Sequence, residues 1–230
     1  MREEVNMRQD IKTIRLALPF NFGSVNCYLI ETDTCYCLID TGISNRRSEL
    51  ERELERTGCK PGSLKLIVIT HGDFDHTGNA AYLRNMFGTK IAMHAGDSGM
   101  AERGDMFWNR KKPNILIKVF APMLFRLNKS DRFTPDFYLD DGDDLSEYGF
   151  DGKVLSIPGH SKGSIGILLM ASGDLFVGDL FENTSKPALS SIMDDQVAAN
   201  GSVEKIKSLQ INTIYPGHGE PFPMDLLIQH

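Results

Sequence analysis

With 230 residues, the chain is long enough for one large domain with a buried core. Its formal net charge of -6 and its sequence pI of about 5.5 argue against the basic field of a nucleic-acid-binding protein, so we expect no nucleic-acid partner. No apolar run reaches the roughly 18 residues of a membrane-spanning helix, and the opening residues MREEVNMRQD contain no apolar signal segment. We therefore expect a cytoplasmic protein.

The first half of the chain predicts short strands and then helices. Runs rich in β-branched and aromatic residues, separated by turn residues, indicate three strands, at 11–18, 25–32 and 35–40. The near-continuous apolar run at 64–70 is typical of a strand that is buried on both faces. The other elements expected here are helices at 44–58 and 77–86 and a strand at 90–94.

The second half returns to strands after an interruption at 97–135. Strands are expected from residue 137 onward, at 153–160, 165–170, 174–180 and 211–219, with a helix within 195–209. Both halves contain short apolar strands that end in polar turns. This pattern predicts an α/β protein with two packed sheets and helices outside them.

The four cysteines are predicted to be reduced and structural. Cys27, Cys35, Cys37 and Cys59 fit no zinc-ribbon or CxxC redox spacing. Cys35 and Cys37 alternate along a strand, which puts them on one face of it. Free buried cysteines behave as small apolar side chains.

Histidines and aspartates recur where the predicted strands end. The segments VITHGDFDH, SIPGHSKG and IYPGHGE each place histidine beside glycine after a β run, and DLFVGDLF places Asp179 in an equivalent position. Strand ends on one edge of a sheet converge on one volume. Imidazole and carboxylate together form the usual ligand set of divalent transition metals. Seven such side chains are too many for one tetrahedral ion and suit a pair of ions.

The order and spacing of these residues resemble the metallo-β-lactamase superfamily, whose pattern is HxHxDH followed by a distant His, an Asp and a last His. The resemblance implies one domain over 1–230 with the αββα fold, a four-layer sandwich of two mixed β-sheets flanked by helices. It also implies that one ion is bound by His71, Asp73 and His160 and the other by Asp75, His76 and His218, with Asp179 bridging them. The segment NCYLI…LIDTG (26–42) resembles the opening strands of the family and makes Asp40 a supporting acid behind the ligands.

Asp73 departs from the family pattern, because the second position of HxHxDH usually holds histidine. A carboxylate oxygen has nearly the same reach from Cβ as imidazole Nδ1, so the ligand position can survive the exchange. The ligands would then carry three negative charges in place of two, which favours manganese or iron over zinc. The alternative interpretation is a lost ligand and a degenerate or one-metal site.

The resemblance implies a metal-dependent hydrolase in which a hydroxide bound by two divalent ions (Zn, Fe or Mn) attacks a carbonyl or phosphorus centre. Asp75 is the candidate proton acceptor. The substrate would be a small molecule with an ester, lactone, thioester or phosphodiester bond. Two alternatives stay open: a di-iron oxidoreductase related to flavodiiron proteins, whose second histidine is also replaced by a carboxylate, and a non-catalytic metal-binding module.

The interruption at 97–135 contains a basic amphipathic segment at 106–130 with six cationic residues and no acid. On a helix, Lys111, Lys118 and Lys129 would form one line opposite an apolar side. Three roles are open: an entrance to the active site that accepts a partly apolar or anionic substrate, a peripheral contact with a membrane, and a homodimer interface. His94 is expected to be structural or rim-lining, and His230 matches no ligand position.

Overall fold

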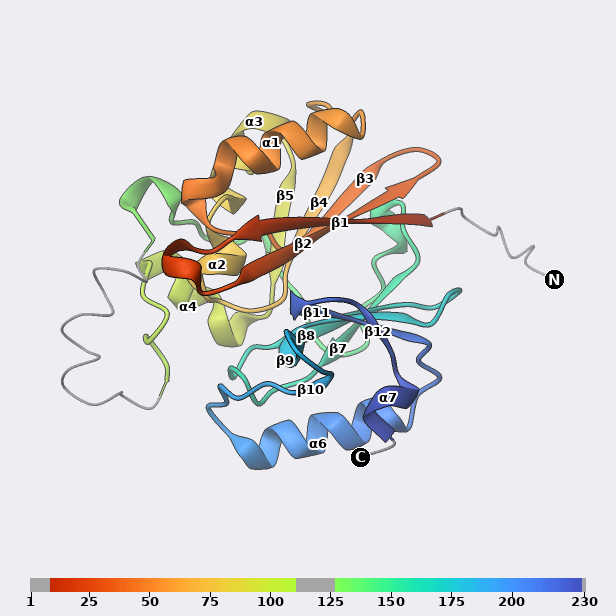
Figure 1. Ribbon diagram of the computed structural model, residues 1–230. Coiled ribbons are helices and arrows are strands. Elements are labelled where there is room, and N and C mark those ends of the chain that lie inside the picture. The colour runs from red at the N-terminus through yellow and green to blue at the C-terminus, as the bar shows by residue number, and fades with distance from the viewer. Residues whose placement is uncertain (1–8, 111–126, 229–230) are drawn as a thin grey trace.

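The computed structural model describes residues 9–110 and 127–228 and shows two β-sheets packed face to face with helices on both outer sides (Figure 1). The first sheet has the order β1-β2-β3-β4-β5-β6. Its strands are β1 (Gln9–Ala17), β2 (Ser24–Thr32), β3 (Tyr36–Ile39), β4 (Leu64–Ile69), β5 (Lys90–Met93) and β6 (Phe137–Tyr138). Strands β1 to β3 are antiparallel neighbours, whereas β3 to β6 run parallel, so the sheet is mixed.

The second sheet has the order β12-β11-β9-β8-β7, with β10 paired to β9. Its strands are β7 (Gly152–Ser156), β8 (Ile165–Leu169), β9 (Asp174–Asn183), β10 (Ala188–Leu189), β11 (Thr213–Gly219) and β12 (Phe222–Pro223). Only the β9–β11 pair is parallel, so this sheet is mixed too. The helices are α1 (Arg47–Arg56), α2 (Phe74–Thr77), α3 (Ala80–Phe87), α4 (Ala95–Arg103), α6 (Gln196–Lys207) and α7 (Asp225–Ile228). The predicted αββα sandwich is confirmed.

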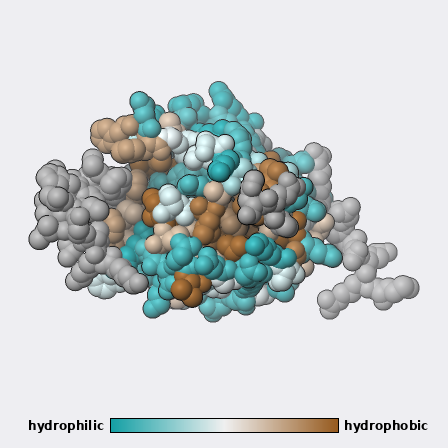
Figure 2. Space-filling view, turned by 60° about the horizontal axis from the view of Figure 1, so that its bottom comes forward, coloured by the Kyte–Doolittle hydropathy of each residue, from teal (hydrophilic) through white to brown (hydrophobic). Residues whose placement is uncertain are grey.

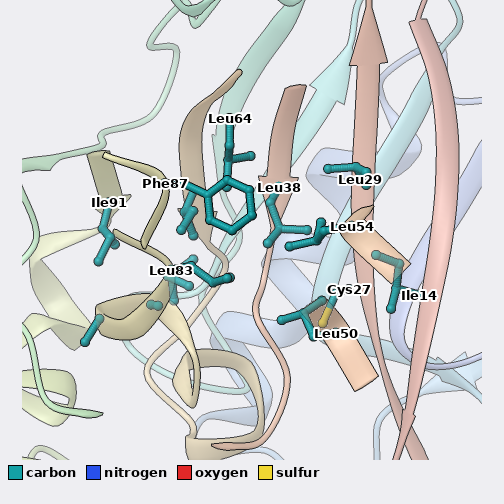
Figure 3. Close-up of a cluster of buried hydrophobic side chains, with 14 of the residues drawn as sticks. Ile14, Cys27, Leu29, Leu38, Leu50, Leu54, Leu64, Leu83, Phe87 and Ile91 are labelled. Atoms are coloured by element: carbon teal, nitrogen blue, oxygen red, sulfur yellow. The ribbon is translucent and has the colours of Figure 1, made fainter. Parts of the chain in front are cut away.

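Three apolar layers hold the sandwich together. Helices α1 and α3 cover the outer face of the first sheet, where Leu50 and Leu54 of α1 meet strand residues such as Leu29 and Leu38 (Figure 3). A second layer lies between the sheets, and a third lies between the second sheet and α6. Both faces of β4 are covered, which explains why its sequence is apolar except for Lys65. Ile67 and Ile69 point into the helix-facing layer, whereas Leu66 and Val68 point between the sheets.

The helix expected at 77–86 is divided into α2 and α3 by Gly78 and Asn79. The Gly78 amide donates to the carbonyl of Gly42, and a Cβ at residue 78 would lie 2.5 Å from the Ser44 nitrogen. The Asn79 side chain donates to the carbonyls of Thr41 and Ile43. The loop after β3 therefore occupies the space that a continuous helix would need.

The range 97–135, where the predicted order of strands and helices is interrupted, begins with a helix, because α4 extends to Arg103. Residues 111–126 lie outside the described residues, and with them most of the predicted basic amphipathic segment. Leu127, on its predicted apolar side, is buried. All four cysteines are free and buried, as predicted.

The surface is mixed in character. On the face shown in Figure 2, hydrophobic and hydrophilic residues alternate over the described part of the chain. Phe20 and Phe22 are an exposed pair in the β1–β2 connection, with exposures of 71% and 63%. Within 9–110 and 127–228, no helix combines the length and the apolar character that crossing a membrane requires.

Candidate metal centre

The predicted ligands come from both sheets. His71 follows the carboxyl end of β4, Asp73 precedes α2, and Asp75 and His76 lie in α2. From the second sheet, His160 follows β7. Asp179 and His218 were expected at the ends of strands; His218 is the second-last residue of β11, whereas Asp179 lies inside β9. The pairing of these two strands shifts register around Pro216, so both side chains can face the site from within a sheet.

Two glycines make room for the converging side chains. Gly178 has φ of +50°, and a Cβ there would lie 2.6 Å from the Thr70 hydroxyl. At Gly217 a Cβ would overlap Asp179 Oδ1 and lie 2.7 Å from the ring of His76. The sequence PGH at 216–218 therefore needs its glycine to leave space for the side chains of Asp179 and His76.

The structure brings the seven residues together as two groups around Asp179. His71, His160 and Asp179 form one set whose ligand atoms all lie within 4.8 Å of one another, and Asp75, His76 and His218 form another. Asp73 Oδ2 joins the first set, at 3.1 Å from His160 Nε2 and 3.7 Å from His71 Nε2. Asp179 lies between the sets: Oδ2 is 3.8 Å from His71 Nε2 and 3.3 Å from His218 Nε2, and Oδ1 is 3.2 Å from His76 Nε2.

The four histidines all turn Nε2 toward this centre. Nδ1 of His160 donates to the carbonyl of Ile192, and Nδ1 of His218 donates to that of Ser24, each at 2.8 Å. Nδ1 of His76 lies 2.8 Å from the Asp40 carboxylate. A carbonyl can only accept, so the Nε2 lone pairs of His160 and His218 are left for a cation. Such hydrogen bonds to the far ring nitrogen are the usual support of metal-ligating histidines.

Asp40 also supports His71, through a threonine. The Thr70 hydroxyl donates to Asp40 Oδ2 at 2.7 Å and lies 3.0 Å from His71 Nδ1. Asp40 is buried and has a positive φ of 59°, a conformation that is uncommon for a residue with a side chain. Backbone strain of this kind concentrates at functional sites. The structure thus places Asp40 behind the histidines, as the resemblance implied.

Unpaired polar atoms show that the centre fits cations. Among the described residues, Nε2 of His71, Nε2 of His76 and Oδ1 of Asp179 are buried and make no hydrogen bond. Leaving buried polar atoms without partners costs free energy, so groups of this kind call for an ion or an ordered water. Imidazole nitrogens and carboxylate oxygens in this number suit transition-metal ions.

The charges of the centre also favour cations. Burial alone would lower the pKa of His218, but the carboxylates of Asp179 and Asp75 outweigh burial and raise that pKa to about 9. Burial alone would raise the pKa of Asp179, but His218 and His76 hold it well below its ordinary value. Because the carboxylates of the centre stabilise positive charge on the histidines beside them, they would stabilise a metal ion in the same place.

Two site residues were not singled out from the sequence, Arg110 and Asp194. Arg110 Nη1 lies 2.8 Å from Asp73 Oδ1, and its Nε lies 2.9 Å from Asp194 Oδ2. Its Nη2 lies 3.2 Å from His160 Nε2. In the sequence, Arg110 was grouped with the cations of the basic segment at 106–130. No sequence signal pairs it with Asp73, because the contact forms only in the folded protein.

Asp97 is a third residue that the sequence did not mark. This buried side chain accepts from the Gly72 amide at 3.0 Å, the Ser161 hydroxyl at 2.6 Å and the Gly163 amide at 2.8 Å. It therefore joins the loop of His71 to the loop of His160. His94 just before it is structural, as expected: its Nδ1 accepts from the Gly96 amide at the start of α4.

A cavity of about 860 Å³ opens onto the centre. Asp73, Asp75, His160, Asp179 and His218 line one part of it, and much of the rest is apolar: Leu18, Pro19, Phe22, Met106, Phe107 and Ile192. Ligand pockets usually combine an apolar lining with a few converging polar groups. The cavity is large enough for a small-molecule substrate beside the centre.

The sequence model of the metallo-beta-lactamase superfamily matches residues 20–218. The chain belongs to the metallo-beta-lactamase superfamily. It is 25% identical to the probable metallo-hydrolase YqjP of Bacillus subtilis (strain 168), over 93% of this chain and 72% of YqjP. It is 30% identical to hydroxyacylglutathione hydrolase GloC of Haemophilus influenzae, over 71% of this chain and 69% of GloC.

Solved structures of the same superfamily share the fold. The crystal structure of TTHA1623 in a di-iron-bound form matches with a TM-score of 0.70 and 25% identity, over 94% of this chain and 96% of that one. BLEG-1, a B3 metallo-β-lactamase, matches with a TM-score of 0.72 at 21% identity, over 96% of this chain and 97% of that chain. As a member of the metallo-beta-lactamase superfamily, the protein is an enzyme, a metal-dependent hydrolase.

Proposed function

We propose that this enzyme uses two divalent metal ions to hydrolyse an ester, lactone, thioester or phosphodiester bond of a small, partly apolar substrate. His71, Asp73 and His160 would hold one ion, Asp75, His76 and His218 the other, and Asp179 both. The observation that carries the proposal is the position of Asp179, whose carboxylate lies within 4 Å of Nε2 atoms from both groups. Two ions in these positions would lower the pKa of water and polarise the substrate oxygen.

The residues around the ions have separate tasks in this proposal. Asp75 faces the cavity, and its Oδ2 lies 3.6 Å from His218 Nε2, so it can take a proton from the attacking water. The apolar lining would receive the nonpolar part of the substrate and exclude water from it. The name of GloC, a hydroxyacylglutathione hydrolase, supports including thioesters in the substrate class.

The nature of the metal is part of the proposal. The di-iron-bound form of TTHA1623 supports iron at a centre of this fold. The carboxylate of Asp73 adds a hard oxygen ligand where the family usually has nitrogen, which supports iron or manganese over zinc. Measurements of metal content and redox activity also test the di-iron oxidoreductase that the sequence left open.

Elemental analysis of protein purified without added metal tests the proposal. We expect two ions per chain in the wild type and about one in each of His160→Ala and His218→Ala. His94→Ala is the matched control, because this histidine supports α4 and belongs to neither group. Full occupancy in both ligand variants would refute the assignment.

Activity against a panel of thioesters, lactones and phosphodiesters then tests the reaction. Hydrolysis should depend on added metal and should be lost in His160→Ala but not in His94→Ala. An iron-loaded protein that is coloured, is redox-active and hydrolyses none of these substrates would favour the oxidoreductase instead.

A further inference from the structure

We propose that Arg110 is a positioning residue that supplies the counter-charge of Asp73, so that the two act together as one neutral ligand. This inference rests on the proposed metal centre and adds a role for a residue outside the ligand motif.

The two carboxylate oxygens of Asp73 have different neighbours. Oδ2 faces the Nε2 atoms of His160 and His71, at 3.1 and 3.7 Å. Oδ1 faces away from His71 toward Arg110 Nη1, at 2.8 Å. One oxygen can thus serve a metal ion while the other keeps its ion pair, and the guanidinium fixes which oxygen does so.

Arg110 is held at this point by its own neighbours in the sequence. The Trp108 ring lies under the guanidinium of Arg103, 3.5 Å from the ring centroid, and packs against Gly99, where a Cβ would lie 2.7 Å from the ring. The Asn109 side chain donates to the carbonyl of Gly96. Helix α4 therefore anchors the segment that delivers Arg110 to the centre.

The side chain of Arg110 is only 6% exposed, and that of Asp73 is 7% exposed. A buried guanidinium stays charged, and a buried carboxylate is costly without a partner, so each needs the other. Asp194 takes the Nε side of the guanidinium, at 2.9 Å. The Asp194 side chain is 29% exposed, so solvent can balance part of its charge. Among the ligands, Arg110 offsets Asp73, and Asp75 and Asp179 carry the remaining negative charges, the number expected if residue 73 were neutral. Asp73 would then favour harder metals through its oxygen atom more than through its charge.

A double-mutant cycle between Asp73→His and Arg110→Gln tests the pairing on EDTA-stripped protein. Zn²⁺ and Mn²⁺ affinities are measured by competition with a chromophoric chelator, and Trp108, the sole tryptophan, reports binding by fluorescence. We expect Asp73→His to weaken Zn²⁺ binding about tenfold or more, because Arg110 then faces the ions without its carboxylate. Arg110→Gln in that background should restore the affinity to about the wild-type value.

Thermal unfolding with and without metal gives an independent readout. Arg110→Gln alone should lower the Tm of the metal-free protein and enlarge the rise in Tm on adding Mn²⁺, whereas Arg110→Lys, which keeps the charge, should change this rise less. Arg15→Gln is the matched control: Arg15 lines the same cavity but pairs with Glu220, and its loss should leave metal affinity unchanged.

The outcomes separate this inference from the function on which it rests. If the wild type binds no metal, both are wrong. If it binds two ions but the double variant binds Zn²⁺ no more tightly than Asp73→His, the pairing is refuted. The same holds if Arg110→Gln lowers Tm equally with and without metal, since Arg110 would then only anchor its loop.

Discussion

The two halves of the centre are built differently. The second half (Asp75, His76 and His218) has only acids and histidines, with Asp40 and the Ser24 carbonyl behind the rings. The first half (His71, Asp73 and His160) contains the unusual carboxylate, touches Arg110 and is tied together by Asp97. The second half therefore keeps the residue types of the family pattern HxHxDH, whereas the first half departs from that pattern at Asp73 and adds Arg110.

The largest effect should come from the residue that joins the halves. Asp179→Asn removes a charge that faces His76, His71 and His218, so we expect kcat/KM to fall by more than about 100-fold, the upper range for residues that only support metal ligands. Asp174→Asn, at the start of the same strand, is the control. An Asp179→Asn enzyme that keeps wild-type turnover would show that the halves work independently.

Replacing Asp40 should weaken metal binding in both halves, but to different extents. It contacts His76 directly but reaches His71 only through Thr70, so Asp40→Asn should weaken metal binding more in the second half than in the first, by about 10- to 100-fold in the second. Thr70→Val should weaken metal binding more in the first half than in the second, because Thr70 contacts His71 directly and reaches His76 only through Asp40. Calorimetric titration of metal into stripped protein would resolve the two steps. Equal losses at both steps in Asp40→Asn would contradict the asymmetry.

Asp73→His should change which metal the first half prefers, and it should have less effect on the metal occupancy of the second half. Nitrogen in place of a hard oxygen should raise the ratio of Zn²⁺ to Mn²⁺ affinity by about tenfold in the first half, even though Arg110 weakens total binding there. Competition between the two metals, read by elemental analysis after dialysis, measures the ratio. An unchanged ratio would mean that Asp73 is not a ligand.

The smallest effect concerns the apolar lining of the cavity beside the centre. Phe22 lines it, whereas its neighbour Phe20 does not, although their rings lie 6.1 Å apart. Phe22→Ser should lower kcat/KM about three- to tenfold for long-chain substrates and hardly at all for short ones, as expected for losing part of one apolar contact. Phe20→Ser serves as the control. A similar loss for both chain lengths would place the substrate elsewhere.

The sequence predicted the fold well, because the spacing of apolar residues and the family motif both indicate two packed sheets with helices outside them. The continuous apolar run of β4 needs covers on both faces, and the αββα sandwich supplies them. It failed where tertiary packing decides local shape. The helix expected at 77–86 begins only at residue 80, because the loop after β3 packs on Gly78, and Asp179, expected at the end of a strand, faces the site from inside β9 through an irregular pairing.

The ligand motifs located the centre, but not the residues that adjust it. All seven predicted residues converge, because each lies in a motif with its own glycine or turn signal. Asp97 and Arg110 belong to no such motif, and they act through contacts with loops far away in the sequence. The sequence pattern of one chain does not show which distant residues Asp97 and Arg110 contact. The role predicted for the basic segment at 106–130 remains a prediction, since 111–126 lies outside the described residues.

The position of the centre across two sheets has a consequence for folding. The first sheet contributes the loop of His71 to His76, and the second contributes His160, Asp179 and His218, so neither sheet alone can form either half. Asp73 and His160 are 87 residues apart in sequence, and closing a loop of that length carries an entropic cost before any contact repays it. Metal ions would therefore bind late in folding, after the two sheets have packed together. Once bound, they would slow unfolding by holding the two sheets together.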